Sequence, residues 1–309
     1  MNRKVIMLGI AGDSAAGKTT LSKGIVDALG SDQVTAICCD HYHKYNRQSR
    51  KELGVSAISP EGNHIDIMEQ HFRLLREGQP VLKPVYNHST GDFDAPEYVR
   101  PTRYVIVEGL LPFHTRLMRL CFDVMVYLDP PEELRRKWKI KRDTTKRGYT
   151  EAQVRESLSH RADLSPRYIQ PQKASADMIV RFSPPECHEE ETGGHLNASL
   201  VLRPTLPHPD LSDVLAQSVN GTISAMRLEL GRYEGKPVDF LEISGAVTPD
   251  KALELETLIQ YHLPPDSQVN LDRLGRYQYG LEENRSYPLA LTQLLITYHM
   301  ITAGETVFT

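Results

Sequence analysis

Residues 12–19 read Gly-Asp-Ser-Ala-Ala-Gly-Lys-Thr and fit the pattern G-x-x-x-x-G-K-[ST]. A β-rich apolar run at residues 5–10 precedes this motif, and apolar residues at helical spacing follow it at positions 21–29. A strand, a glycine-rich turn and a helix in this order form the setting in which the motif binds phosphate. The motif therefore predicts an α/β fold whose first helix directs its N-terminus at phosphate oxygens.

The individual residues of this phosphate loop have separate expected roles. Glycines let the backbone turn tightly and direct N–H groups at phosphate oxygens. Lys18 can reach the β- and γ-phosphates, and the Thr19 hydroxyl can bind Mg²⁺. The residues expected to bind ATP are Gly12, Asp13, Ser14, Ala15, Ala16, Gly17, Lys18, Thr19 and Thr20. A chance match in a glycine-rich turn is the alternative, and the flanking strand and helix argue against it.

Further apolar runs predict the rest of the sheet. They lie at residues 34–39, 104–107, 122–128 and 176–182, and helical patterns lie between several of them, for example around residues 67–75. Strands that alternate with helices indicate a mostly parallel sheet covered on both faces. The expected class is a P-loop NTPase-like three-layer α/β fold, extended by antiparallel strands from the C-terminal third of the chain.

An acidic stretch rich in Pro and Gly, residues 183–194, is the candidate domain boundary. We expect a P-loop kinase core over residues 1–183, with a basic lid segment at 135–150, and a C-terminal α/β extension of the same sheet over residues 195–309. In that extension, strand-like runs lie at residues 198–202, 223–230 and 238–243, and helical patterns lie at 249–262 and 289–303. The close spacing of these runs favours antiparallel strands.

Two acidic residues at predicted strand ends are candidates for chemistry. The run at 104–107 ends in Glu108, which suits Mg²⁺ binding beside the phosphate loop, directly or through water. The run at 34–39 is followed by Asp40, and ligands collect at the carboxyl ends of parallel strands. Asp40 is therefore a candidate general base for an attacking hydroxyl, or an acid linked to the metal. For Glu108, an exposed acid in a strand-end turn is the alternative.

Two polar clusters could hold the molecule that accepts the phosphate. In the first, His43 and Arg47 follow the second strand, and a guanidinium group can bind a sugar phosphate through two hydrogen bonds. The second cluster, residues 83–91, carries hydroxyl, amide and imidazole groups that could line a sugar pocket, among them Tyr86 and His88. Ordinary polar surface loops are the alternative for both clusters.

A third cluster is strongly basic. Eight of the thirteen residues from 135 to 147 are Lys or Arg, and Asp143 is the only acid in the cationic part of this segment, residues 135–147. At helical spacing, Lys139, Arg142 and Asp143 lie near one face. In P-loop kinases a basic lid closes over the transferring phosphate, excludes water and neutralises developing charge. A solvated cationic helix and a nucleic-acid patch are the alternatives, and the net charge of -4 argues weakly against the second.

The composition excludes several other classes of protein. No apolar run approaches the roughly 18 residues that a membrane span needs. The four cysteines, Cys38, Cys39, Cys121 and Cys187, lack C-x-x-C spacing, which favours a reducing cytoplasm over a disulfide framework or a zinc site. The sequence also lacks the N-K-x-D motif that reads guanine in GTPases. We therefore expect a cytoplasmic protein with neither a membrane nor a nucleic acid as partner.

Five segments resemble the phosphoribulokinases, within the wider phosphoribulokinase and uridine kinase family, and occur in the same order. They are GIAGDSAAGKTT, CCDHYHKYNR, KPVYNHSTG, VIVEG and KIKRDTTKRGYT. The resemblance covers residues 4–182, and the segments 40–47 and 139–147 carry its specificity. The remainder of the chain is similar in layout.

This resemblance implies a kinase that uses ATP and Mg²⁺ to convert D-ribulose 5-phosphate into ribulose 1,5-bisphosphate in carbon fixation. It also implies a homodimer or a larger homo-oligomer. By position, Asp40 resembles the catalytic base, and Glu108 resembles the Walker-B acid. The remaining matches are to sugar-phosphate binders, namely His43 and Arg47, and to lid and substrate-contact residues, namely Lys139, Arg142, Asp143 and Arg147.

Together, the expected catalytic residues are Lys18, Asp40, Arg142 and Asp143, and the expected metal ligands are Thr19 and Glu108. The acceptor is expected to contact His43, Arg47, Tyr86, His88, Lys139, Arg142 and Arg147. Three alternatives stay open at this point. They are a uridine or other nucleoside kinase, a kinase for another pentose phosphate, and a nucleotide-binding regulator without catalytic activity.

Overall fold

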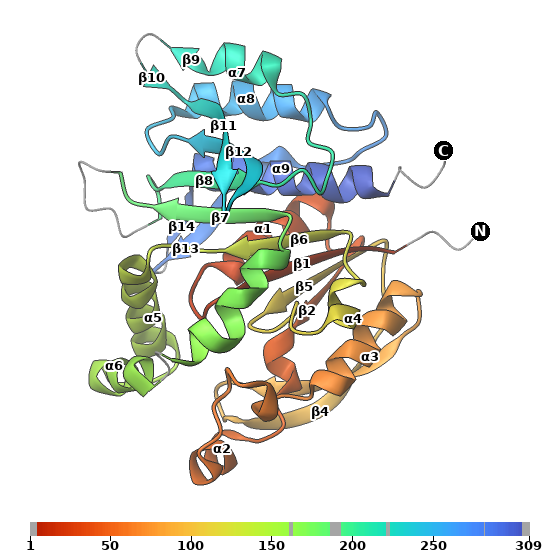
Figure 1. Ribbon diagram of the computed structural model, residues 1–309, viewed down its shortest axis with the longest axis vertical. Coiled ribbons are helices and arrows are strands. Elements are labelled where there is room, and N and C mark those ends of the chain that lie inside the picture. Colours follow the sequence, from red (N-terminus) through yellow and green to blue (C-terminus); the bar gives the residue numbers. More distant parts are fainter. Residues whose placement is uncertain (1–4, 161–162, 186–192, 221–222, 281, 305–309) are drawn as a thin grey trace. The chain divides into compact units, whose positions relative to one another are not determined.

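The computed structural model describes residues 5–160, 163–185, 193–220, 223–280 and 282–304 (Figure 1). Cys187, and residues 186–192 of the candidate boundary, lie outside the described residues. The chain divides into two compact units, each assembled from segments that are distant in sequence. The first unit comprises residues 1–18, 32–127 and 135–176, and the second comprises residues 19–31, 128–134 and 177–309.

The first unit contains a parallel sheet. β5 (Tyr104–Gly109) pairs in parallel with β1 (Ile6–Gly12) on one side and with β2 (Val34–Cys38) on the other. β6 (Val124–Leu128) follows β1 in the strand order. All of β1 is buried, as expected of a near-continuous apolar strand covered on both faces. The predicted parallel sheet is therefore confirmed.

The remaining elements of the first unit are one hairpin and several helices. The hairpin consists of β3 (Val81–Asn87) and β4 (Asp92–Val99). The helices are α2 (Arg47–Leu53), α3 (Ile65–Arg76), α4 (Arg116–Arg119), α5 (Glu132–Lys146), which enters this unit at Arg135, and α6 (Glu151–His160). α3 buries Met68, His71, Phe72 and Leu75, the spacing of a single apolar helix face.

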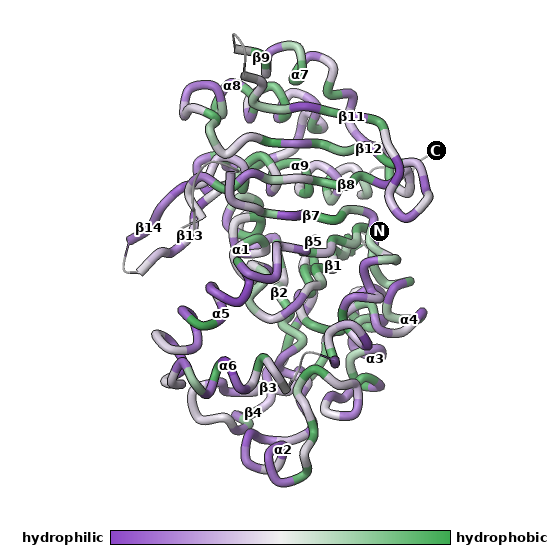
Figure 2. The backbone as a smooth tube through the Cα atoms, turned by 60° about the vertical axis from the view of Figure 1, so that its left-hand side comes forward, coloured by the Kyte–Doolittle hydropathy of each residue, from purple (hydrophilic) through white to green (hydrophobic). Residues whose placement is uncertain are grey.

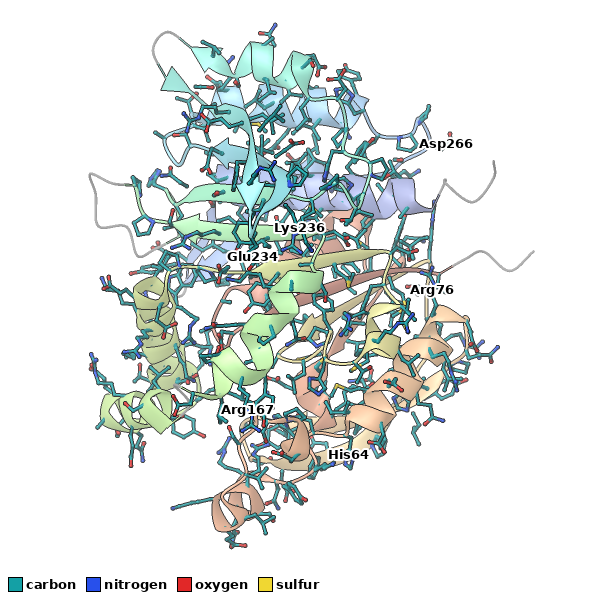
Figure 3. All side chains as sticks on the ribbon, viewed as in Figure 1. His64, Arg76, Arg167, Glu234, Lys236 and Asp266 are labelled. Carbon is teal, nitrogen blue, oxygen red and sulfur yellow. The ribbon has the colours of Figure 1, made fainter. Side chains whose placement is uncertain are left out.

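Two contacts of the first unit connect other segments of the chain to β1. Arg76 of α3, labelled in Figure 3, donates hydrogen bonds to the carboxylate of Asp123, which also accepts one from the backbone N–H of Met7 at 2.8 Å. Phe113 packs directly on the backbone of β1. A Cβ atom added at Gly9 would lie 2.3 Å from the Phe113 ring, so a side chain at position 9 would displace that ring.

The second unit contains an antiparallel sheet. Its strand order is β11-β12-β8-β7, formed by Met226–Tyr233, Lys236–Ile243, Asn197–Leu202 and Met178–Ser183. All three pairings are antiparallel, which confirms the antiparallel strands predicted for the C-terminal part. The apolar run 223–230 is not one strand. It is divided at Ala225 between β10 (Ile223–Ser224) and β11.

Helices and short hairpins complete the second unit. The helices are α1 (Lys18–Leu29), which enters at Thr19, α7 (Ser212–Ser218), α8 (Pro249–Tyr261) and α9 (Tyr287–Ala303). The short strands are β9 (Val219–Asn220), which pairs with β10, and β13 (Arg276–Tyr279), which pairs with β14 (Glu282–Arg285).

Apolar residues dominate α9 (Figure 2). Most of the side chains of this helix are buried. Gln293, one of several buried polar residues of α9, joins this helix to α1. Its amide group donates to the backbone carbonyls of Thr20 and Leu21 at 3.1 and 3.2 Å. A Cβ atom at Gly24 would lie 2.1 Å from the Gln293 side chain, so this approach requires a glycine in α1. Within the described residues no helix, α9 included, has both the length and the apolar character needed to cross a bilayer.

Candidate active site

The phosphate loop follows β1 with an unusual backbone. Gly12, Ala15 and Gly17 all have positive φ angles, of 151°, 66° and 96°. For Ala15 this left-handed conformation costs about 1 kcal/mol or more, and such strain concentrates at functional sites. A Cβ atom at Gly17 would meet no heavy atom within 4 Å. The loop therefore borders open space of the kind that a phosphate group would fill.

Lys18 is held inside this loop. Its ammonium group donates hydrogen bonds to the carbonyl oxygens of Gly12 at 2.9 Å and of Asp13 at 2.8 Å. Burial lowers the pKa of Lys18, and the carboxylates of Glu108 and Asp40 act in the opposite direction. The Lys18 ammonium group is therefore bonded to two backbone carbonyl oxygens, and phosphate oxygens could replace these acceptors.

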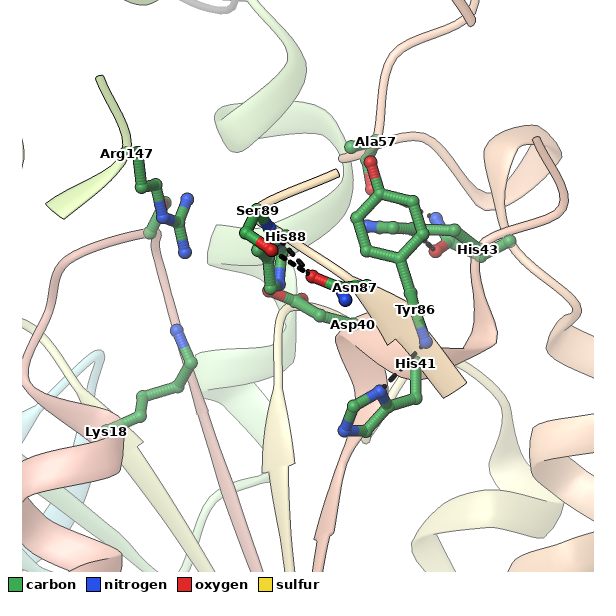
Figure 4. Close-up of polar contacts among 12 residues, drawn as sticks. Lys18, Asp40, His41, His43, Ala57, Tyr86, Asn87, His88, Ser89 and Arg147 are labelled. Carbon is green, nitrogen blue, oxygen red and sulfur yellow. Dashed lines mark hydrogen bonds and ion pairs between the residues drawn. The ribbon is translucent and has the colours of Figure 1, made fainter. Parts of the chain in front are cut away.

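Asp40 lies in a 3₁₀ turn, Cys39–Tyr42, directly after β2. This turn packs closely on the end of β5, because a Cβ atom at Gly109 would lie 2.3 Å from that of Cys39. His88 approaches Asp40 from the β3–β4 hairpin, with 3.5 Å between His88 Nε2 and Asp40 Oδ2. Figure 4 shows the tips of Lys18 and Arg147 directed toward the space beside Asp40.

The charge state of Asp40 follows from these neighbours. Burial by itself raises the pKa of Asp40, but the hydrogen bond with His88 and nearby positive charge, including that of Lys18, outweigh burial. The pKa of Asp40 therefore lies well below its usual value, and the carboxylate is ionised at neutral pH. An ionised carboxylate at the edge of a pocket can accept a hydrogen bond from a substrate hydroxyl.

The β3–β4 hairpin positions two of the predicted acceptor contacts, Tyr86 and His88. Gly91 in its turn has a φ of 77°, and its carbonyl accepts a hydrogen bond from the backbone N–H of Arg47 at 2.7 Å. The Arg47 guanidinium in turn donates to the carbonyl of His88. On the other side, the backbone N–H of Tyr86 donates to His41 Nδ1 at 3.1 Å. The hairpin is thus joined both to α2 and to the turn that carries Asp40.

Most of the basic segment forms α5, and three of its cations lie close to the carboxylate of Asp143. Lys139 Nζ lies 2.6 Å and Arg142 Nε 2.8 Å from the Asp143 carboxylate, with Arg147 at 3.7 Å. Burial raises the pKa of Asp143, but the hydrogen bonds from Arg142 and Lys139 outweigh it, and the pKa is lowered. Arg142 also donates to the Ser14 hydroxyl at 3.1 Å, so α5 contacts the phosphate loop.

These elements surround one open pocket with about 560 Å³ of empty space. Its walls bring together most of the residues that the sequence predicted for the acceptor, namely His43, Arg47, Tyr86, His88, Lys139 and Arg147, and they include Asp40 and Ser14. Arg142 and Asp143 are not part of this lining, but they are bonded to each other and, through Asp143, to Lys139.

The predicted metal ligands are in separate elements. Glu108 is half-buried at the end of β5, and Thr19 follows Lys18 in the first turn of α1, with Thr20 after it. Among the described residues, no three or more His, Cys, Asp or Glu side chains are grouped so that they could hold a metal ion. Thr19 and Glu108 therefore stay predictions as Mg²⁺ ligands.

Arg50 and Tyr149 also line the pocket, and neither residue was predicted from the sequence. Arg50 Nη2 donates to the Tyr86 hydroxyl at 2.6 Å, and the guanidinium carbon lies 4.9 Å from the centre of the Tyr86 ring. Tyr149 lies beneath the Arg47 guanidinium at 5.7 Å. Arg50 stands one helical turn after Arg47 in α2, so a predicted helix at this position would have indicated it.

The sequence of this chain is similar to those of known kinases. The profile described as "Phosphoribulokinase / Uridine kinase family" matches residues 7–187. A phosphoribulokinase of Synechocystis sp. is 39% identical over 92% of this chain and 88% of its own length. A chloroplastic phosphoribulokinase of Chlamydomonas reinhardtii is 33% identical over 65% of this chain and 58% of its own. A uridine kinase of Geobacillus kaustophilus is 28% identical over 58% of this chain and 87% of its own.

Among solved structures, a phosphoribulokinase from Rhodobacter spheroides has a similar fold. Its TM-score is 0.59 at 19% sequence identity, and the match covers 84% of this chain and 98% of that one. Both the mostly parallel sheet with flanking helices and the antiparallel C-terminal strands agree with the fold class expected from the sequence.

Proposed function

This chain belongs to the phosphoribulokinase and uridine kinase family, and on that premise we propose that it transfers the terminal phosphate of ATP to D-ribulose 5-phosphate. The product is ribulose 1,5-bisphosphate. The observation that carries the proposal is the charge of the pocket, where one carboxylate, Asp40, faces the cations Arg47, Arg50, Lys139 and Arg147. Such a pocket suits an acceptor that already carries a phosphate group.

The cations have two tasks in the proposed reaction. Arg47 and Arg147 would hold the phosphate of the acceptor, since guanidinium groups bind phosphate through paired hydrogen bonds. In phosphoryl transfer, negative charge spreads over the oxygens of the moving group. Lys18 in the phosphate loop, and Arg142 beside Ser14, would stabilise that charge. Thr19 and Glu108 would hold Mg²⁺, which neutralises phosphate charge when it is bound.

Asp40 would orient the attacking hydroxyl and receive its proton. Because the pKa of Asp40 is lowered, this carboxylate is a weak base, and a full proton transfer before the reaction would be unfavourable. In a loose transition state the hydroxyl oxygen becomes acidic only as its bond to phosphorus forms. Asp40 would therefore position the hydroxyl first and take its proton late.

A comparison of acceptors tests the proposal. Release of ADP should be much faster with ATP, Mg²⁺ and ribulose 5-phosphate than with ATP, Mg²⁺ and uridine, because only the sugar phosphate engages the cations of the pocket. Ribose 5-phosphate and xylulose 5-phosphate serve as isomeric controls. Measurement of kcat/KM for each acceptor by a coupled ADP assay decides the matter. Faster turnover of uridine would reverse the assignment.

Arg147 and its neighbour Lys146 provide a matched pair of variants. Arg147 lines the pocket, whereas Lys146, the last residue of α5, is exposed. Arg147→Met should raise the KM for ribulose 5-phosphate by about 10- to 100-fold, the effect of losing a charge-assisted hydrogen bond. Lys146→Met should leave this KM unchanged. Equal effects of the two substitutions would mean that Arg147 contributes only general positive charge.

Two further proposals concern the state of the protein in the cell. We propose that it forms a homodimer or a larger homo-oligomer, as the resemblance to its family implies, and light scattering coupled to size-exclusion chromatography measures the mass directly.

A cytoplasmic location is supported by the free thiols of Cys38, Cys39 and Cys121. Fractionation of the source cells tests it.

A further inference from the structure

His43 makes one hydrogen bond that determines how it can meet a substrate. Its side chain lines the acceptor pocket and is 3% exposed, and its Nδ1 atom lies 2.8 Å from Oδ1 of Asn63. Asn63 is also buried, at 4% exposure, and the two residues form an isolated antiparallel bridge. Asn63 belongs to none of the motifs that identify the phosphate loop, the lid or the strand-end acids.

The neighbours of Asn63 fix the orientation of its amide group. The Nδ2 atom donates to the backbone carbonyls of Ala57 at 3.0 Å and of Ser59 at 2.8 Å. A carbonyl oxygen can only accept a hydrogen bond, so the NH₂ end of the amide must face these two groups. The Oδ1 end therefore faces His43. Because this oxygen is also only an acceptor, the proton of the shared hydrogen bond belongs to His43 Nδ1.

The second ring nitrogen of His43 is consequently an acceptor. Burial lowers the pKa of His43 to about 4, with Asp40 acting to raise it and Arg50 and His88 to lower it. The ring is therefore neutral at pH 7, and its single proton is on Nδ1. Within the part of the chain that the structure describes, Nε2 has no hydrogen-bond partner. An edge-to-face contact with Tyr86, 4.9 Å between ring centroids, limits rotation of the ring.

A neutral imidazole with a lone pair on Nε2 can form a hydrogen bond with a hydroxyl group of a sugar phosphate but not with its phosphate oxygens. Phosphate oxygens are acceptors, so a lone pair offers them no hydrogen bond and repels their charge. A sugar hydroxyl can donate. We infer that Asn63 is a positioning residue that holds His43 as the Nδ1–H tautomer, so that His43 Nε2 accepts a hydrogen bond from a hydroxyl of the acceptor. The identity of that acceptor rests on the proposed function; the tautomer does not.

Nuclear magnetic resonance tests the tautomer without any substrate. In the ligand-free protein labelled with ¹⁵N-histidine, long-range ¹H–¹⁵N correlations should give His43 a protonated Nδ1 and an unprotonated Nε2 that stay unchanged from pH 8 to about pH 6. Asn63→Leu removes the accepting oxygen and should allow the Nε2–H tautomer to appear. A predominant Nε2–H tautomer, or an imidazolium at pH 7, in the wild-type protein would overturn the inference even if the variant does not fold.

Two substitutions of His43 test the role of Nε2. Asparagine can place its NH₂ group where Nδ1 stands and keep the bond to Asn63, but it has no atom at the Nε2 position. Glutamine reaches the Nε2 position and can offer an oxygen there. His43→Asn should raise the KM for ribulose 5-phosphate about tenfold, as expected for one hydrogen bond. His43→Gln should raise it less, and the KM for ATP should stay constant in both.

The outcomes separate this inference from the proposed function. If His43→Asn leaves the KM for ribulose 5-phosphate unchanged, or if His43→Gln is the more damaged variant, Nε2 does not accept a substrate hydroxyl and the inference fails. If the tautomer is as stated but ribulose 5-phosphate is not phosphorylated, the proposed acceptor is wrong. The comparison of His43→Asn and His43→Gln is then repeated with the acceptor found in the kinetic screen, and equal KM values for the two variants there would reject the role of Nε2.

Discussion

Replacement of Asp40 with asparagine should lower the turnover number by about 10²–10⁴, the usual contribution of a general base, and leave ATP affinity largely unchanged. Asparagine preserves the size of the side chain but cannot take a proton. The hydrogen bonds that hold Lys18 within the phosphate loop involve the carbonyls of Gly12 and Asp13, and they do not depend on Asp40. A coupled ADP assay measures turnover, and calorimetry measures the dissociation constant of ATP.

Asp66→Asn is the matched control for this prediction, because Asp66 is an exposed carboxylate in the first turn of α3. It should have the turnover of the wild-type protein. A parallel loss of ATP affinity in Asp40→Asn would assign Asp40 to the metal and exclude it as the base. Turnover within about a factor of three of wild type would show that the hydroxyl needs no carboxylate at position 40.

Removal of the Asp143 carboxylate should lower the free energy of unfolding by about 3–5 kcal/mol in Asp143→Ala. Lys139 is 4% exposed, and the substitution would leave its ammonium group buried without this partner at 2.6 Å. Arg142 would lose its bond as well. Urea denaturation at pH 7, followed by circular dichroism, measures the difference between wild type and variant.

The difference in the free energy of unfolding between wild type and Asp143→Ala should depend on pH in a defined direction. The folded protein lowers the pKa of Asp143, so its stabilising contribution is present above the unfolded pKa and is lost as the pH falls through the folded value. The difference between wild type and Asp143→Ala should therefore shrink below about pH 4. The double variant Lys139→Met/Asp143→Leu removes both charges and should regain most of the stability but not the activity. A single variant as stable as wild type would contradict the proposed role of Asp143 in the lid.

The phosphate loop, the parallel strands and most of the pocket could be predicted from the sequence for a physical reason. Buried parallel strands are short apolar runs, and the residues that follow them must meet at one edge of the sheet. Asp40 was found in this way. The basic cluster of residues 135–147 was recognisable because charge of one sign at helical spacing is visible in any sequence.

The β3–β4 hairpin and Asn63 could not be found by the same rules. β4 is exposed along most of its length, so it lacks the alternation of apolar and polar residues that indicates a strand, and it contains Pro96. In β3, Pro84 stands where the register shifts between Lys83 and Val85. The bond between Asn63 and His43 joins residues twenty positions apart, and only the folded chain brings them together.

The contact between Gln293 and Gly24 limits where this protein can be truncated or joined to a fusion partner. The first turn of α1, the helix that begins at the phosphate loop, is hydrogen-bonded to Gln293 in α9. A variant truncated before α9 would keep every proposed catalytic group. It would, however, leave empty space at Gly24, where the Gln293 side chain packs, and expose the apolar surface that α9 covers. Tags and fusion partners should therefore be attached after α9 and should not replace this helix.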